Sequence, residues 1–165
     1  MSSELFLAGM RKVAGAVSVI TTVGNDGERR GLTATAICSL SVEPPSLIAC
    51  VNRKTWVAQF VPARGVFAVN VLCHAQETIA RTFAGQTELH AGDRFSVGDW
   101  ATGETGAPIV RGALVSFECR LESLVEHTTH IILIGQVVQT RPGEGHPLVY
   151  LDGAFSSVPR PFSVA

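Results

Sequence analysis

Charged side chains are scarce in this sequence. Asp, Glu, Lys and Arg make up 16% of the 165 residues, whereas a typical soluble domain carries about 25%. The 13 basic and 14 acidic residues give a formal net charge of −1, so the chain lacks the positive surface that binds a nucleic-acid backbone. We therefore expect no nucleic-acid partner, and we interpret the shortage of charge as a sign of a surface buried against another subunit.

Long apolar runs and metal-binding or disulfide patterns are also missing. No uninterrupted apolar run approaches the ~20 residues that a membrane span needs. Residues 5–20 resemble a leader peptide, but Arg11 and Lys12 interrupt them and residues 1–4 carry no positive charge. The cysteines lie in apolar segments without CxxC spacing: Cys38, Cys50, Cys73 and Cys119. These absences predict a soluble, cytoplasmic protein with reduced thiols, no membrane anchor and no bound metal.

Familiar catalytic and nucleotide-binding motifs are absent as well. The chain contains no GxGxxG, no GxxxxGK[ST] and no GxSxG. His127 and His130 are three residues apart, which places them on opposite faces of a strand and argues against a shared metal. Glu118, Glu122 and Glu126 are evenly spaced, which is typical of the solvated face of a strand. Hydrolysis is therefore disfavoured, and a nucleotide would have to bind in another way.

Most of the elements that the sequence predicts are β-strands. Runs of β-branched and apolar residues between turn residues predict strands at 17–23, 32–38, 46–52, 66–72, 113–126, 131–140 and 148–151. Asn25, Asp26 and Gly27 predict a hairpin turn between the first two strands.

Three short helices interrupt the strands. Ser2 or Ser3 is expected to cap the first, which Gly15 ends; the second covers 55–61 and ends at Pro62; the third covers 75–83. Antiparallel strands with short helices, and no repeat or linker, predict one mainly β domain over residues 1–165. Its expected form is a closed or nearly closed barrel.

The segment at residues 31–41 alternates hydroxyl side chains with small or apolar ones. Thr33, Thr35, Ser39 and Ser41 therefore share one face of a strand. The alanines between them leave room for a flat ligand to approach the backbone, while the hydroxyls can bond its polar edge. A strand with a solvated threonine face fits the same pattern.

A second segment, residues 50–55, leaves a strand and enters a helical pattern. Lys54 and Thr55 stand at the helix start, where free N–H groups and the helix dipole favour an anion. Thr55 fits equally well as a simple helix cap. Pro44 and Pro45 make a short turn between the two segments, so adjacent strands can serve one ligand's ring and phosphate. His130, at the start of a strand, is either a donor to a substrate or a solvated side chain.

Taken in order, several segments resemble one family: 31–41 (GLTATAICSLS), 44–52 (PPSLIACVN), 67–72 (FAVNVL), 83–85 (FAG), 93–95 (DRF), 130–135 (HIILIG) and 147–150 (PLVY). The family is that of the short-chain flavin reductases, which are the reductase partners of two-component flavin monooxygenases. The resemblance covers residues 11–158 and is greatest to the reductase components of 4-hydroxyphenylacetate 3-monooxygenases. It implies the split β-barrel of FMN-binding type, with a Greek-key-like closure.

The resemblance also implies a site. It assigns flavin-binding positions along the hydroxyl strand, at the neighbouring strand end, in the phosphate turn and in a covering loop, and it assigns two positions to the nicotinamide nucleotide. The flavin positions are Thr33, Ala34, Thr35, Ala36, Ser39, Cys50, Val51, Asn52, Lys54, Thr55, Phe83, Ala84, Gly85, Arg94 and Phe95, and the nicotinamide positions are His130 and Tyr150.

The implied function is NAD(P)H-dependent reduction of FMN or FAD by a homodimer that supplies reduced flavin to a partner monooxygenase. Hydride passes between the cofactors, so no catalytic side chain is expected. Many members carry Gly-Asp before the histidine, whereas this chain has Thr128 and Thr129, one of which is expected to replace the carboxylate that orients His130. An FMN-bound reductase of another acceptor, such as a cobalt corrinoid, and a non-catalytic flavin-binding protein remain alternatives. The sequence does not show whether the protein uses NADH or NADPH, or whether it uses FMN or FAD.

Overall fold

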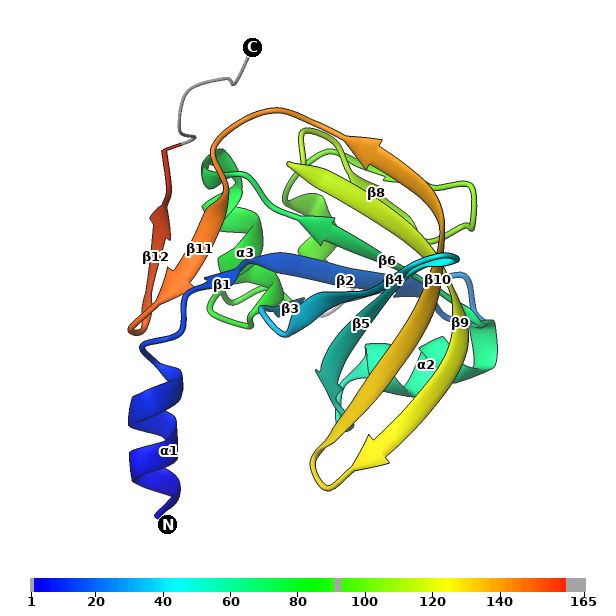
Figure 1. The fold of residues 1–165 in the computed structure, drawn as a ribbon. Coiled ribbons are helices and arrows are strands. Elements are labelled where there is room, and N and C mark those ends of the chain that lie inside the picture. Colours follow the sequence, from blue (N-terminus) through cyan, green and yellow to red (C-terminus); the bar gives the residue numbers. More distant parts are fainter. Residues whose placement is uncertain (1, 91–92, 160–165) are drawn as a thin grey trace.

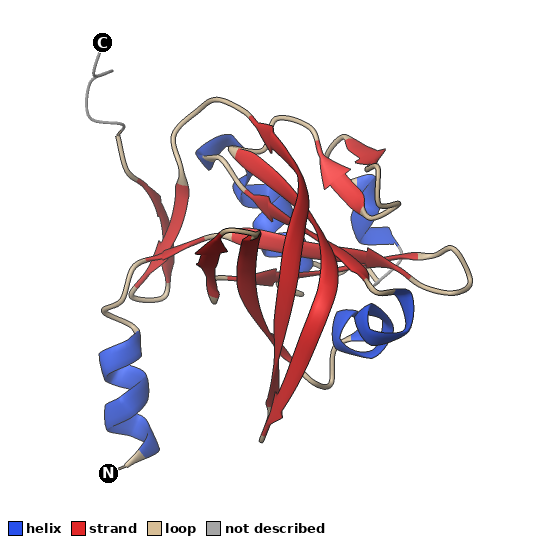
Figure 2. Cartoon of the chain, turned by 45° about the vertical axis from the view of Figure 1, so that its right-hand side comes forward, coloured by secondary structure: helices blue, strands red, loops and turns tan. Residues whose placement is uncertain are grey.

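The computed structural model describes residues 2–90 and 93–159. Its centre is a seven-stranded antiparallel sheet in the order β3-β2-β6-β9-β10-β5-β4, and Figure 1 shows these strands curving around a common interior. The strands are β2 (Ser18–Val23), β3 (Arg29–Ala34), β4 (Ile37–Val42), β5 (Pro45–Asn52), β6 (Val66–Val71), β9 (Val115–His127) and β10 (His130–Pro142). Figure 2 shows the length and the bend of β9 and β10.

The two smaller sheets flank this one. The order β1-β11-β12 joins β1 (Gly15–Ala16), β11 (Leu148–Leu151) and β12 (Ala154–Ser157), and β7 (Trp100–Thr102) pairs with β8 (Pro108–Val110). Strands β3 and β4 are the two edges of the large sheet and do not pair with each other. The mainly β architecture is therefore as predicted, while closure of the barrel stays a prediction.

One predicted strand has the wrong bounds. Residues 32–38 do not form a single strand, because β3 ends at Ala34 and β4 begins at Ile37. The chain passes here from one edge of the large sheet to the other. Alternation of side chains cannot reveal this break, because the pattern of residue types continues across it.

The predicted helices are present with different ends. Helix α1 (Ser3–Met10) is capped by Ser2, whose hydroxyl accepts the Leu5 N–H at 3.3 Å, and it ends well before Gly15. Helix α2 (Trp56–Arg64) continues through Pro62. Pro62 lies in the last turn and removes a single N–H from the helix. Gly65 then ends α2 in the left-handed conformation and donates its N–H to the Val61 carbonyl at 2.8 Å.

The third predicted helix divides in two: a 3₁₀ turn, η1 (His74–Gln76), leads into α3 (Glu77–Phe83), and another 3₁₀ turn, η2 (Asp93–Ser96), follows later in the chain. No helix within residues 2–90 and 93–159 has the length and apolar character needed to cross a membrane.

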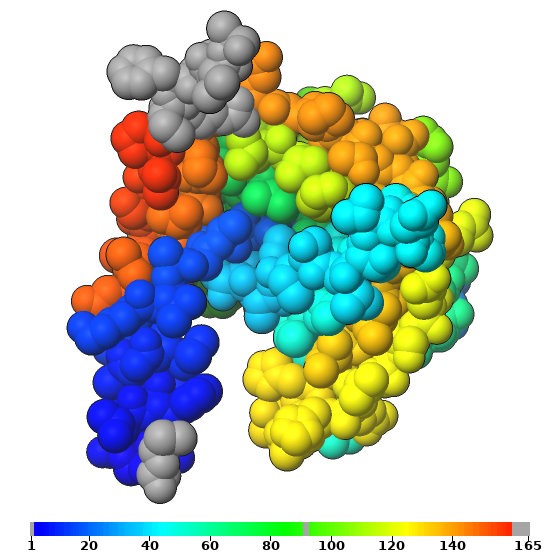
Figure 3. Space-filling view, in the orientation of Figure 1, coloured from blue at the N-terminus to red at the C-terminus, as the bar shows by residue number. Residues whose placement is uncertain are grey.

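The core lies inside the curved sheet and continues beneath α3. One cluster of buried side chains, centred on Phe67 and Leu133, fills the space between the sheet and α2. A second cluster, with Leu72 and Phe83, packs between α3 and the small sheets. Helix α1 has no buried residue, and Figure 3 shows it standing away from the remainder of the chain.

The carboxylates of β9 do not all lie on a solvated face, contrary to the expectation from their spacing. Glu122 and Glu126 are exposed, but Glu118 is fully buried. The loop between β7 and β8 folds over it, so that Gly103 lies directly against its carboxylate. Sequence spacing cannot show that a distant loop covers one position of a strand.

Candidate functional site

A cavity of about 470 Å³ opens where the β3–β4 connection meets the end of β5, the start of α2 and the turn after α3. A volume of this size suits a small-molecule ligand. The lining contains no aspartate or glutamate and consists of Gly31, Leu32, Thr33, Ala34, Thr35, Ala36, Cys50, Val51, Asn52, Thr55, Trp56, Phe83, Ala84, Gly85, Arg94 and His130.

The two threonines of the first wall differ in what they contact. The Thr33 hydroxyl donates to the Ala80 carbonyl of α3 at 2.7 Å. The Thr35 hydroxyl bonds to no other group among the described residues and remains available to a ligand. The small side chains of Ala34 and Ala36 beside it keep the backbone accessible. This wall can therefore accept a flat polar ligand at Thr35, whereas Thr33 holds α3 in place.

The start of α2 forms the second wall. Thr55 caps the helix: its hydroxyl donates to the Asn52 carbonyl at 2.7 Å and accepts the Ala58 N–H at 3.3 Å. The Asn52 side chain accepts the Lys54 N–H at 3.0 Å, which fixes the turn. The first N–H groups of a helix lack partners within it and favour negative charge. The structure thus confirms that Thr55 caps α2, and because Thr55 also lines the cavity, the binding of an anion at this helix start stays a prediction.

Arg94 supplies a cation to the same space. It lines the cavity, and its Nε is buried without a hydrogen-bond partner among the described residues. Gly85 has a φ of 74°, and a Cβ there would lie 3.4 Å from an Arg94 terminal nitrogen, so the glycine turn leaves room for the guanidinium. Arg94 as a whole is half-buried and makes no ion pair with the described residues, and a partly desolvated cation of this kind is stabilised by a negative charge. The arrangement therefore favours an anionic ligand.

His130 lies at the third wall, opposite Asn52 in the pairing of β10 with β5. Its Nδ1 is 2.9 Å from the Thr129 hydroxyl, which confirms the expectation that a neighbouring threonine contacts the ring in place of a carboxylate. The Nε2 atom has no such partner among the described residues, so it is left to a ligand in the cavity.

Aromatic packing supports the loop that closes the cavity. The Phe83 ring meets Phe95 at 4.9 Å and Trp100 at 5.2 Å between centroids. These contacts hold the Ala84–Gly85 turn from behind. Cys50, on the opposite side, carries a thiol whose pKa is raised by burial and by the nearby Cys38. It therefore presents a neutral, protonated group to the cavity.

A family model described as a flavin reductase like domain matches residues 10–159. The chain belongs to this family. FMN reductase (NADH) RutF of Ancylobacter novellus is 38% identical over 159 residues, which cover 96% of this chain and 86% of that protein.

Two solved flavin reductases share the fold. BorF, the flavin reductase component of a bacterial two-component tryptophan halogenase, is 30% identical with a TM-score of 0.87, over 97% of this chain and 100% of that one. The NADH:FAD oxidoreductase SgcE6 of Streptomyces globisporus, solved with NAD and FAD fragments, is 32% identical with a TM-score of 0.85. The match covers 96% of this chain and 94% of that one.

In this flavin reductase the structure gathers most of the predicted site residues around one cavity. Those in its lining are Thr33, Ala34, Thr35, Ala36, Cys50, Val51, Asn52, Thr55, Phe83, Ala84, Gly85, Arg94 and His130. They come from segments that are distant in the sequence and adjacent in the flavin reductase fold.

Four predicted residues lie outside that lining. Ser39 borders an apolar depression on the β4–β5 edge. Phe95 supports Phe83 and borders a neighbouring hollow. Tyr150 lines two other hollows, both of which Thr35 also lines, and the Lys54 side chain is exposed to solvent at the turn.

The sequence reasoning missed Gly31, Leu32 and Trp56, which also line the cavity. Gly31 lies against the Phe83 ring, where a Cβ would collide with it. Trp56 directly follows the predicted phosphate turn. A large aromatic residue at a predicted helix start, next to that turn, was the signal that could have identified it.

Proposed function

We propose that this flavin reductase transfers hydride from a reduced nicotinamide nucleotide to FMN or FAD and supplies the reduced flavin to a partner monooxygenase. The observation that supports this most directly is the cavity whose lining has no carboxylate, in which Arg94 has no counter-ion among the residues that the structure describes. A flavin phosphate supplies the missing negative charge. The relatives named as FMN reductase (NADH) and as an NADH:FAD oxidoreductase support flavin and NADH as the substrates.

The residues present fit a flavin. Thr35 and the backbone beside Ala34 and Ala36 would hold the ring and its polar edge, while Arg94 and the N-terminus of α2 would hold the phosphate. The cofactors carry the redox chemistry themselves, so the chain has to bind and orient them and needs no catalytic side chain. His130 would orient the nicotinamide, with Thr129 fixing its ring.

Steady-state NADH and NADPH oxidation with FMN and with FAD tests the activity. We expect rapid oxidation in at least one of the four pairings. An absence of turnover with any free flavin would refute the proposal, and tight flavin retention without nicotinamide-dependent bleaching would identify a carrier instead.

The placement of His130 has its own test. In the kinetic assay and in a flavin titration, His130→Ala should raise the KM for the nicotinamide nucleotide more than the Kd for flavin. A larger loss of flavin affinity would contradict the placement of His130.

The role of Arg94 has a separate binding test. Arg94→Gln should weaken FMN binding about tenfold or more, because it removes a charge-assisted contact, and should affect riboflavin much less, because riboflavin has no phosphate. Arg64→Gln, at the exposed end of α2, is the matched control. Equal losses for FMN and riboflavin would exclude a phosphate contact.

We also propose that the protein is a homodimer with its flavin near the subunit interface. The exposed side of α1 is strongly apolar: Leu5 is 68% and Leu7 60% exposed. Leu7 and Met10 border a groove that reaches Thr35 and Tyr150, so a surface of this kind runs up to the flavin cavity. A second copy of the chain would bury it.

The remaining expectations form part of the same proposal. Residues 1–165 form a single domain, and β3 and β4 complete a split, Greek-key-like barrel through the short connection between them. Four free cysteines support a reducing, cytoplasmic location. The near-zero net charge argues against nucleic-acid and anionic-membrane partners.

A further inference from the structure

Trp56 is an aromatic side chain that the proposed reaction does not use. It is the first residue of α2, lines the cavity and is 54% exposed. Its ring packs on Phe60 at 6.0 Å between centroids and lies 5.6 Å from the Arg30 guanidinium. These contacts hold the indole at the cavity mouth, where more than half of its surface remains open.

A second hollow is lined by residues that are sequence neighbours of the cavity lining. It has a volume of about 520 Å³ and lies between β3 and η2, lined by Gly27, Glu28, Arg29, Arg30, Asp93, Phe95 and Ser96. Arg30 precedes Gly31 of the first cavity, and Asp93 and Phe95 flank Arg94, so the two spaces share their walls. We call this space the outer hollow.

The outer hollow also provides a cation. The Arg29 guanidinium lies 5.8 Å from the Phe95 ring centroid and makes no ion pair with any carboxylate of the described residues. Arg30, by contrast, is paired with Asp26 and Glu28. Among the described residues, Arg94 in the cavity and Arg29 in the outer hollow are thus two cations without an ion pair, although Glu28, which is paired with Arg30, and Asp93 also line the outer hollow.

We infer that this end of the site binds the adenylate half of FAD, with the adenine on Trp56 and the diphosphate between Arg94 and Arg29. The inference rests on the proposed function, because it takes the phosphate to lie at Arg94 and the start of α2. FMN ends at that phosphate and would leave Trp56 and the outer hollow uncovered. FAD extends beyond it, and bases stack well on exposed aromatic rings.

The adenine of the nicotinamide nucleotide is the competing occupant. That co-substrate has to reach the flavin ring, which the proposal places along residues 33–36. A hollow outside the α1 groove borders this stretch, and Thr33, Thr35 and Tyr150 are among the residues that line it. The co-substrate therefore has its own approach on the ring side, away from Trp56.

Equilibrium binding of FAD and FMN to the full-length protein tests the inference. The wild type should bind FAD about tenfold or more tightly than FMN, because a stacked base contributes that much to affinity. Trp56→Ala should remove most of this preference, and Trp56→Phe should retain it. Gln59→Ala, exposed on the same helix, should match the wild type.

The failures are distinguishable. Equal wild-type affinity for the two flavins, or a Trp56→Ala variant that weakens both by the same factor, overturns the adenylate site even if NADH is oxidised rapidly. A higher KM for NADH in Trp56→Ala with an unchanged FAD-to-FMN ratio assigns the indole to the other nucleotide and also overturns it. If the protein shows no turnover but still binds FAD more tightly than FMN, the proposed reaction is refuted and the adenylate site is supported. Trp56→Phe keeps the test valid if Trp56→Ala does not fold.

Discussion

Thr33 and Thr35 are residues of the same type in nearby positions, yet their roles in the structure differ. Thr33 and Thr35 both line the cavity, but only the Thr33 hydroxyl is bonded within the protein, to the Ala80 carbonyl. A buried carbonyl that loses its donor is costly, whereas a hydroxyl open to the cavity is free to bond a ligand. The two positions should therefore respond differently to the same substitution.

Thr35→Val should weaken flavin binding by roughly 0.5–1.5 kcal/mol, the contribution of one hydrogen bond, with little effect on stability. Thr33→Val should instead lower the free energy of unfolding by about 1 kcal/mol or more. Flavin titration and urea denaturation of both variants check this. Unchanged flavin affinity in a stable Thr35→Val protein would exclude the hydroxyl contact.

Cys119 is a second residue whose burial has a measurable effect. Burial, and then the neighbouring Glu118 carboxylate, raise the pKa of its thiol from 9.0 to about 12. Below pH 9 both the folded and unfolded states keep the proton. Between pH 9 and 12 the unfolded state loses it while the folded state retains it, so the free energy of unfolding falls with rising pH.

The wild type should therefore lose up to about 1.4 kcal/mol per pH unit more than Cys119→Ala over this window. Urea denaturation at pH 8.5, 10 and 11 measures the two slopes, and only their difference matters because other groups titrate there too. Parallel curves for the two proteins would show that the thiol is not protected by burial.

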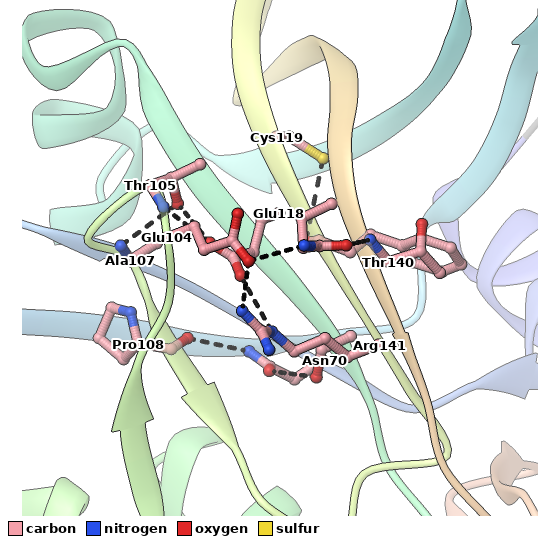
Figure 4. Close-up of polar contacts among 12 residues, drawn as sticks. Asn70, Glu104, Thr105, Ala107, Pro108, Glu118, Cys119, Thr140 and Arg141 are labelled. Carbon is pink, nitrogen blue, oxygen red and sulfur yellow. Dashed lines mark hydrogen bonds and ion pairs between the residues drawn. The ribbon is translucent and has the colours of Figure 1, made fainter.

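At the scale of elements, a buried carboxylate ties the β7–β8 loop to the large sheet. Glu118 of β9 accepts the Thr105 N–H at 2.8 Å and its hydroxyl at 3.0 Å, and Arg141 of β10 donates to it at 3.2 Å. Arg141 also reaches Glu104 at 3.1 Å. Figure 4 shows these side chains converging from the loop and the two strands.

Glu118→Ala should cost about 2–4 kcal/mol of stability, because it leaves the half-buried Thr105 groups without an acceptor and removes the buried partner of Arg141. Glu122→Ala, exposed on the same strand, should change stability by less than about 0.5 kcal/mol. Urea denaturation of both variants gives the comparison. A loss below 1 kcal/mol for Glu118→Ala would mean that the loop is held by its other contacts.

The element scale also shows what the sequence could predict. Strong β patterns located β2, β5, β6, β9 and β10. The strand predicted at 32–38 instead joined the end of β3 to the start of β4, because the hydroxyl alternation runs through the break at residues 35 and 36. The end of α2 was misplaced at Pro62, since a proline in a last turn costs only one hydrogen bond. The short strands β1, β7, β8 and β12 were missed, although β11, which also has four residues, was predicted at 148–151.

For the site, residue types and order were enough to name most of the lining. They did not reveal which hydroxyl is already bonded, that Glu118 is covered or that Trp56 stands at the mouth. Each of these depends on what another element brings against the residue. Tertiary contacts of that kind leave no local signature in the chain.

At the scale of the whole molecule, α1 is the part that the remainder of the chain does not cover. Its exposed apolar side chains include Leu5, Phe6, Leu7 and Met10, and the helix stands apart in Figures 1 and 3. Such a surface is unfavourable in water unless a partner buries it.

Charged residues on the apolar surface of α1 should shift the proposed homodimer towards monomers. Phe6→Glu combined with Leu7→Glu should raise the dimer dissociation constant by at least tenfold, as about 1.4 kcal/mol of lost burial requires. Val125→Glu, an exposed apolar residue at the far end of β9, is the control. Sedimentation velocity distinguishes the two forms, and an unaffected dimer would place the interface elsewhere.

The walls of the cavity that we propose for flavin come from residues 31–36, 50–52, 55–56, 83–85, 94 and 130, and only the completed fold brings them together. An unfolded chain therefore has no comparable affinity for the ligand, and mass action couples flavin concentration to folding. Ligand at a hundred times its Kd would add about 2.7 kcal/mol to the free energy of unfolding. The cell's flavin supply would in this way set the resistance of the protein to heat and proteolysis as well as its rate.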